Sequence, residues 1–312
     1  MINIFLNFKF YFRLMINLHT IIKIKTMIKI SRKFFTIPAL CGLCSIFFLV
    51  TSCKPKKVEV LDEEITKDTL SEGTKNSLES ISVNIPSPTE VTGEIAGAGI
   101  SFNKSIINPT SKASSYATNY QKALNLGVYG SDLGYVTGFK QMQDALEYIG
   151  TVKKLAEETG VSSAYDEAAI KKIVDNMSKV DSAEKTSALI KEVYQKAERN
   201  LRSHQRVEVA GLVVTAGWIE GLYVAVQALG TTPRDSKNEK LYSRIWNQAY
   251  SYQYVAQLLS DNQKNPDFAK LIEELKDVKT LCKSLENKPR INNADVLLLK
   301  EKITAVRNKI TG

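Results

Sequence analysis

The chain has 312 residues, of which 44% are hydrophobic and 24% are charged, and its formal net charge is +9. This length and composition exclude a disordered chain and a small disulfide-stapled protein, and they allow one large domain or two small ones. Seven basic residues and no acidic residue lie in positions 1–52, so the rest of the chain carries only +2. That small charge gives no reason to expect a nucleic-acid partner.

Residues 27–53 have the features of a secretory signal peptide. A basic region is followed by an apolar stretch over 34–50, and the stretch ends in Val50-Thr-Ser-Cys53. These four residues resemble the lipobox of bacterial lipoproteins, in which the Cys is lipidated. We therefore predict that residues 1–52 are a leader that contains the lipoprotein signal peptide, and that Met27 is the start of translation. The mature protein would be attached to a membrane through acyl chains on Cys53. The alternative is an uncleaved N-terminal membrane helix.

The next two segments differ from the rest of the chain in composition. Residues 53–84 begin with the Cys to be lipidated and are otherwise rich in Lys, Glu, Ser and Thr, which predicts a disordered tether. Residues 85–115 contain Pro86, Pro88 and several glycines, which favours an extended arm or loops packed on the domain. Residues 116–312 then form the folded domain.

This domain has helical periodicity throughout. The first apolar face, which ends near Gly160, consists of Tyr135, Phe139, Met142, Leu146 and Ile149. Further stripes occupy residues 170–177, 189–201 after a start at Asp181, 241–259, 268–282 after Asn265-Pro266, and 299–310 after Asn293. No stretch alternates with period two over the length of a strand. The predicted fold is therefore an all-α multi-helix bundle, preceded by the flexible tether.

Residues 207–229 are apolar around the whole circumference of a helix, which is typical of a central helix or a membrane span. Glu208 and Glu220 interrupt the stretch, and a carboxylate in mid-span is costly in lipid. We therefore predict a buried central helix. Two pairs of glycines, in Gly217-x-x-x-Gly221 and Gly134-x-x-x-Gly138, are expected to let neighbouring helices approach closely.

Common catalytic and metal-binding patterns are missing from the sequence. After the leader, His204 is the only His and Cys282 the only thiol besides Cys53. The Cys41-x-x-Cys44 spacing lies in the apolar stretch of the leader and is taken as a chance feature. After the leader, zinc-site spacings, a nucleophile elbow, a dinucleotide-binding Gly motif and a P-loop are all absent. The sequence thus predicts no metal, no cofactor and no enzymatic activity.

Two blocks remain as candidates for a site. In residues 123–135, Gly127 and Gly130 can break a helix, and Asp132 can cap one or accept hydrogen bonds from the backbone. In residues 217–223, Glu220 lies on an apolar helix and needs a partner such as Arg244, Lys140, a Tyr hydroxyl or a ligand. The favoured interpretation is structural: Asp132 is a cap, and Glu220 belongs to a satisfied interior network.

Two functional alternatives stay open for these blocks. In the first, one pocket between helices binds a cation or a small polar ligand. Its lining residues would be Tyr129, Asp132, Tyr135, Trp218, Glu220 and Tyr223. In the second, the protein is a hydrolase in which Asp132 and Glu220 form an acid/base pair across an open cleft.

The segments GVYGSDLGY (127–135) and GWIEGLY (217–223), together with IPSPTE (85–90), resemble an uncharacterised family of helical lipoproteins of Bacteroidota. This resemblance implies a location in the cell envelope and offers no catalytic residues to carry over. Lys54, directly after the Cys, resembles the outer-membrane sorting signals of other lipoproteins. The predicted protein is lipid-anchored, on the outer membrane and facing the periplasm. Its helical domain would bind or scaffold an envelope protein or a small ligand.

Overall fold

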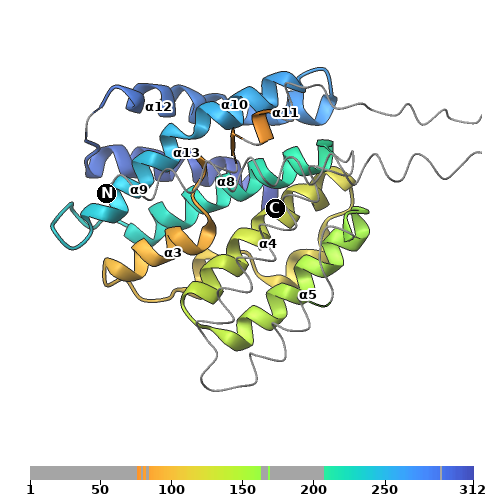
Figure 1. Cartoon of the computed structure of the whole chain (residues 1–312), viewed down its shortest axis with the longest axis horizontal. Coiled ribbons are helices and arrows are strands. Elements are labelled where there is room, and N and C mark those ends of the chain that lie inside the picture. The colour runs from red at the N-terminus through yellow and green to blue at the C-terminus, as the bar shows by residue number, and fades with distance from the viewer. Residues whose placement is uncertain (1–75, 79, 82–83, 163–167, 169–206, 289) are drawn as a thin grey trace, which may run out of the picture. The chain divides into compact units, whose positions relative to one another are not determined.

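The computed structural model describes residues 76–78, 80–81, 84–162, 168, 207–288 and 290–312. Within these ranges the chain forms helices and no β-strand, which confirms the all-α prediction (Figure 1). Cys53, His204 and the stripes predicted over 170–177 and 189–201 lie outside the described residues. The α-helices are α3 (Pro88–Gly97), α4 (Asn119–Gly138), α5 (Met142–Glu158), α8 (Val207–Leu229), α9 (Glu239–Tyr250), α10 (Tyr252–Asp261), α11 (Pro266–Glu274), α12 (Lys276–Glu286) and α13 (Asn293–Thr311).

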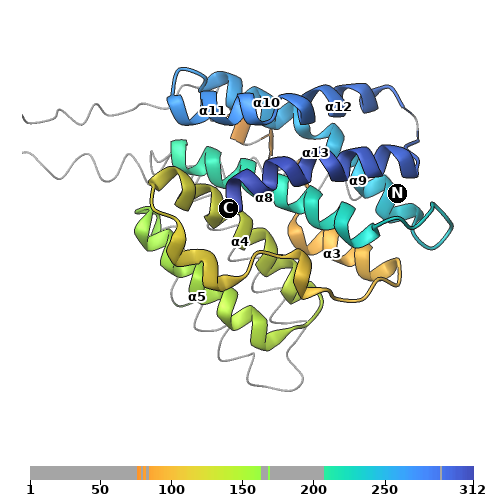
Figure 2. The same ribbon diagram turned by 180° about the vertical axis from the view of Figure 1, so that it is seen from behind.

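Helix α8 is the centre of the bundle, as predicted. It packs against α3, α4, α9, α10 and α13. Figures 1 and 2 show α4 and α5 on one side of α8, and α9 to α12 on the other. Among the described helices, α8 alone is long and apolar enough to cross a membrane, and 89% of its most apolar stretch is buried inside the protein. Its apolar surface is thus covered by the neighbouring helices.

Helix α4 is continuous, so the prediction that Gly127 and Gly130 break it is wrong. It starts with a capping box between Thr118 and Gln121 and runs for 20 residues. The need for glycine at 127 is steric, because a Cβ there would lie 2.1 Å from the carbonyl oxygen of Val213. The absent side chain allows the backbones of α4 and α8 to touch, and this brings the middle parts of both helices together.

The apolar face predicted from Tyr135 to Ile149 is divided between two helices. The chain turns after Gly138, where Lys140 has a φ of 59°, and α5 begins at Met142. Leu146, which was placed on the buried face, is 36% exposed. The predicted end at Gly160 is confirmed, since its φ of 69° is the left-handed conformation that glycine adopts at helix ends.

The segment after the predicted tether is more regular than the sequence suggested. Pro88 stands in the first turn of α3, where no amide hydrogen is needed, and Ser87 and Glu90 form a capping box. The expectation of an irregular arm is therefore wrong for Pro88–Gly97. The tether prediction also fails at its end, because Leu78 and Ile81 are buried and lie in helical segments.

Helix α3 packs against α4 where the second pair of glycines lies. A Cβ at Gly134 would lie 2.3 Å from the Cβ of Pro88, and a Cβ at Gly138 would lie 2.4 Å from a methyl carbon of Thr92. This confirms that Gly134-x-x-x-Gly138 permits close helix approach. The contact places the N-terminal half of α3 directly on the C-terminal half of α4.

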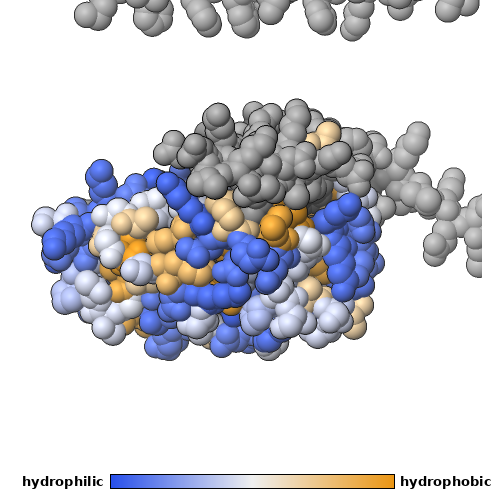
Figure 3. All heavy atoms as spheres, turned by 90° about the horizontal axis from the view of Figure 1, so that it is seen from below, coloured by the Kyte–Doolittle hydropathy of each residue, from blue (hydrophilic) through white to orange (hydrophobic). Residues whose placement is uncertain are grey.

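The C-terminal helices follow the predicted stripes with two extra breaks. The stripe over 241–259 is divided at Ser251, and the stripe over 268–282 is divided at Leu275. Asn265 caps α11 as predicted, and α13 carries the last stripe. In the face shown in Figure 3, hydrophilic side chains surround smaller apolar areas, which is usual for a surface in contact with water.

Candidate functional site

The two candidate carboxylates face each other in the interior of the bundle. Asp132 lies in the middle of α4 and Glu220 in the middle of α8, and both side chains are fully buried. They meet because the close approach of these helices at Gly127 brings their central turns together. Asp132 is thus an interior helical residue, and the prediction that it caps a helix is wrong.

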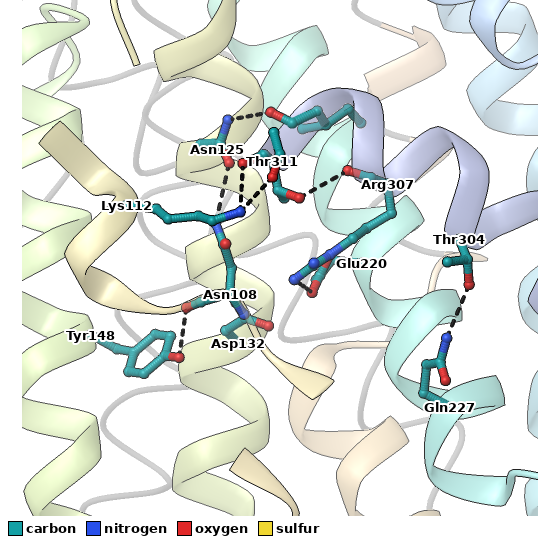
Figure 4. Close-up of polar contacts among 12 residues, drawn as sticks. Asn108, Lys112, Asn125, Asp132, Tyr148, Glu220, Gln227, Thr304, Arg307 and Thr311 are labelled. Atoms are coloured by element: carbon teal, nitrogen blue, oxygen red, sulfur yellow. Dashed lines mark hydrogen bonds and ion pairs between the residues drawn. The ribbon is translucent and has the colours of Figure 1, made fainter. Parts of the chain in front are cut away.

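Glu220 is paired with Arg307 of α13, whereas the sequence suggested Arg244 or Lys140. The guanidinium donates from Nε to Oε2 at 3.1 Å and from Nη2 to Oε1 at 3.2 Å (Figure 4). This two-bond arrangement is the geometry in which Arg holds a carboxylate best. The guanidinium carbon also lies 4.6 Å from the ring centroid of Tyr223, within the range of a cation–π contact. The pair therefore joins α8 to α13 inside the core.

Asp132 has a different environment. Its Oδ2 accepts the backbone N–H of Asn108 at 3.0 Å, and its Oδ1 accepts no hydrogen bond within the described part of the chain. Burial, followed by the neighbouring charge of Glu220, raises the pKa of Asp132 well above its ordinary value, although the Asn108 amide and Arg307 act in the opposite direction.

Burial also raises the pKa of Glu220, while the charge and hydrogen bonds of Arg307 oppose that rise. Burial alone would lower the pKa of Arg307, but Glu220 raises it above the ordinary value, so the guanidinium stays charged. One cation balances one carboxylate. The two-bond pairing with Arg307 favours the charged form of Glu220, and burial beside that charge favours the protonated form of Asp132.

Asn108 is the central residue of the surrounding polar network (Figure 4). Its carbonyl oxygen accepts the hydroxyl of Tyr148 on α5 at 2.8 Å. Its side-chain amide donates to the hydroxyl of Tyr116 at 2.9 Å and to Oδ1 of Asn125 at 3.4 Å. The adjacent Pro109 carbonyl accepts the hydroxyl of Tyr129 at 2.8 Å. Asn108 and Pro109 lie between two short 3₁₀ helices, η1 (Lys104–Ile106) and η2 (Thr110–Ser115), and these bonds fasten that loop to α4 and α5.

The same network holds the end of α13. Asn125 donates to the carbonyl oxygen of Ile310 at 2.9 Å, and Lys112 donates to the carbonyl oxygens of Thr311, at 3.4 Å, and Gly312. Carbonyl groups in the last turn of a helix have no partner within the helix, so these side chains satisfy them. The contacts also fix α13 at the height at which Arg307 reaches Glu220.

The six residues predicted to line one pocket separate into three places. Glu220 and Tyr223 contact Arg307, and Asp132 lies near enough to interact with the charge of Arg307. Tyr129 lies near Asp132. Trp218 points elsewhere, since its indole nitrogen donates to the carbonyl oxygen of Gln248 and to the hydroxyl of Ser251, both at 3.0 Å. Tyr135 stacks on Phe102 at 5.3 Å between ring centroids, and its hydroxyl accepts the N–H of Asn103. These residues do not line a common pocket.

Sequence reasoning missed Arg307, although a signal was present. Arg307 follows Ile303 by four positions and precedes Ile310 by three, so it lies on the apolar stripe of α13. A charged residue on a buried stripe requires an opposite charge, and Glu220 on the central helix has the same requirement. The two could have been matched by this shared need.

The arrangement stabilises the fold and offers little for catalysis. Both carboxylates are enclosed, and two hollows in the described surface lie elsewhere, between α3 and α9 and beside α10. No group of three or more His, Cys, Asp or Glu within the described ranges is placed to hold a metal ion. Cys282 is a free thiol in the core, and burial raises its pKa to about 12. It is therefore poorly suited to act as a nucleophile.

Comparison with known proteins adds no assignment. The chain matches no protein-family model, no curated protein and no solved structure. The resemblance to helical lipoproteins of Bacteroidota therefore remains a prediction from the three sequence segments named above.

Proposed function

We propose that this protein is a lipid-anchored protein of the cell envelope whose helical domain works by binding or scaffolding. The observation that carries the proposal is the sequence Val50-Thr-Ser-Cys53 at the end of an apolar signal-peptide stretch. Acyl chains on Cys53 would hold the protein on a membrane. Lys54 supports the outer membrane, with the domain facing the periplasm.

The burial of the candidate catalytic groups supports binding over catalysis. An acid/base pair needs access to a substrate, whereas Asp132 and Glu220 are enclosed and Glu220 is neutralised by Arg307. This geometry disfavours the hydrolase alternative. A rigid helical domain with its charges satisfied inside presents its outer surface as the functional part.

The anchor is tested by comparing two Cys variants. The protein is expressed in a Gram-negative host that is fed radiolabelled palmitate, and its membrane and soluble fractions are separated. We expect wild type and the control Cys282→Ser to carry label and to sediment with membranes. Cys53→Ser should carry no label. Label that persists in Cys53→Ser, or wild-type protein without label, would refute the anchor.

The small-ligand or cation-binding alternative has one observation in its favour. The buried Oδ1 atoms of Asn108 and Asp132 accept no hydrogen bond from the described residues. A protonated Asp132 would account for one of these two atoms, which leaves Oδ1 of Asn108 without a partner among the described residues. Melting curves recorded with added Na⁺, K⁺ or Ca²⁺ decide the question. A cation that raises the melting temperature of wild type, but not of Asp132→Asn, would establish this alternative.

A further inference from the structure

A groove of about 580 Å³ lies between α3 and the beginning of α9, and neither buried carboxylate lines it. This volume is within the range of about 300–1,000 Å³ that is usual for ligand sites. Gly93, Gly97 and Gly99 form part of one side of the groove. Lys240 and Arg244 of α9, with Lys237 just before that helix, line the other side.

Gly93 and Gly97 have no reason to be glycine within the described structure. A Cβ at Gly127, Gly134 or Gly138 would collide with a neighbouring helix, but a Cβ at Gly93 or Gly97 would meet no atom within 4 Å. Neither residue has a positive φ. Glycine is a poor residue for a helix interior, so α3 loses helical stability at two positions without an internal contact in return. The missing side chains keep the surface of α3 accessible to another chain.

The charges along the groove are only partly balanced. Arg244 forms an ion pair with Glu94 at 3.5 Å, and Glu90 accepts the N–H of Ser87 in the capping box of α3. Lys237 and Lys240 are exposed, and neither forms an ion pair with a described residue. Two positive charges at one wall of the groove are therefore available for an anionic partner.

We propose that this groove binds an acidic peptide segment of another envelope protein. Carboxylates of the segment would pair with Lys237 and Lys240, while its main chain lies on the glycine surface of α3. The charge complementarity selects an acidic partner, and the open glycine surface selects an extended chain that needs close backbone approach. The proposal rests on the scaffolding function proposed above and gives that function a surface and a partner class.

The test uses the full chain, purified in mild detergent, and a fluorescein-labelled hexaglutamate peptide as probe, with hexaglutamine as the neutral probe. Fluorescence anisotropy should show binding of hexaglutamate alone, and binding should weaken at high salt. Lys237→Glu with Lys240→Glu should weaken binding by about tenfold or more, since two charge pairs become repulsive. The matched control is Lys279→Glu with Lys283→Glu on α12, which makes the same change of charge elsewhere and should leave binding unchanged.

Gly93→Leu separates a shaped site from general attraction between charges. It leaves the charge unaltered, fills the groove and replaces a poor helix former. We expect it to abolish binding while it raises the melting temperature by about 2 °C.

The proposal would be overturned if wild type did not bind hexaglutamate, if the α12 control lost as much affinity as the Lys237 and Lys240 variant, or if Gly93→Leu bound hexaglutamate as tightly as wild type. Binding to vesicles containing phosphatidylglycerol without binding to hexaglutamate would also overturn it and would indicate a lipid surface. Palmitate labelling at Cys53 is measured separately, so failure of the groove and failure of the anchor are distinguishable.

Discussion

The buried carboxylates should substitute for each other as the counter-ion of Arg307. Glu220 accepts both hydrogen bonds from the guanidinium, and burial and the charge of Glu220 raise the pKa of Asp132, which favours its neutral form. If Glu220→Gln removes that charge, the pKa of Asp132 falls, and Asp132 becomes the anion that faces Arg307. If Asp132→Asn is made instead, Glu220 remains the anion.

The expected free energies follow from the number of charges left unpaired. Asp132→Asn exchanges one buried hydrogen bond for another and should cost about 1 kcal/mol. Glu220→Gln breaks the two-bond geometry and should cost about 2 kcal/mol. The double variant leaves the buried guanidinium with no anion and should cost about 5 kcal/mol, the upper part of the range for broken buried pairs. The coupling between the sites is then about 2 kcal/mol.

Urea unfolding followed by circular dichroism, with linear extrapolation to water, measures these values at pH 7. A loss of about 5 kcal/mol is comparable with the whole stability of many domains, so the double variant can fail to fold. Adding Arg307→Met to it removes the unpaired cation and should restore folding. If the losses of the two single variants add up to the loss of the double variant, or if Arg307→Met restores no stability, the two carboxylates do not share the role of counter-ion.

Three further outcomes are expected from the same measurement. Gly127→Ala should cost about 3 kcal/mol or more because its Cβ would press on the Val213 carbonyl oxygen. Gly150→Ala is the control, since its Cβ meets open space, and it should stabilise the protein by about 0.5–1 kcal/mol. Equal changes in stability for the two variants would contradict the close contact of α4 and α8. The pKa of Asp132 is raised above its ordinary value of 3.8 in the folded state, so between these two pKa values the folded protein binds a proton that the unfolded chain has lost. Wild type should therefore lose stability relative to Asp132→Asn as the pH rises from about 4. A stability difference that does not change with pH would refute a protonated Asp132. Ser87→Ala should cost about 0.5–2 kcal/mol through loss of the α3 capping box, and no loss would show that the box contributes nothing.

The sequence predicted helix content well because apolar spacing is a local property. The stripe of α13, the start of α11 at Asn265-Pro266 and the end near Gly160 all depend on residues within a few turns. Errors arose at residue types that can play two different structural roles. Pro88 was interpreted as a helix breaker but occupies the first turn of a helix, and Gly127 was interpreted as a break but provides close packing.

The candidate site was only partly within reach of the sequence. Glu220 lies on an apolar helix, and any carboxylate buried in this way needs a partner, so the sequence predicted that Glu220 has one. The identity of the partner depends on how α8 and α13 are aligned, and this alignment is set by side chains distant in the chain, including Lys112 and Asn125. Local patterns contain no information on that alignment.

The sequence by itself determined that the domain is helical, that the stretch over 207–229 belongs in its interior and that Glu220 must be neutralised there. These properties follow from periodicity and from the cost of burying charge, which act residue by residue. Only the tertiary structure decided that Asp132 and Glu220 share one cation, Arg307, and that Trp218 and Tyr135 lie apart from them. It alone also placed Gly93 and Gly97 beside Lys237 and Lys240, because packing between helices determines which distant residues meet.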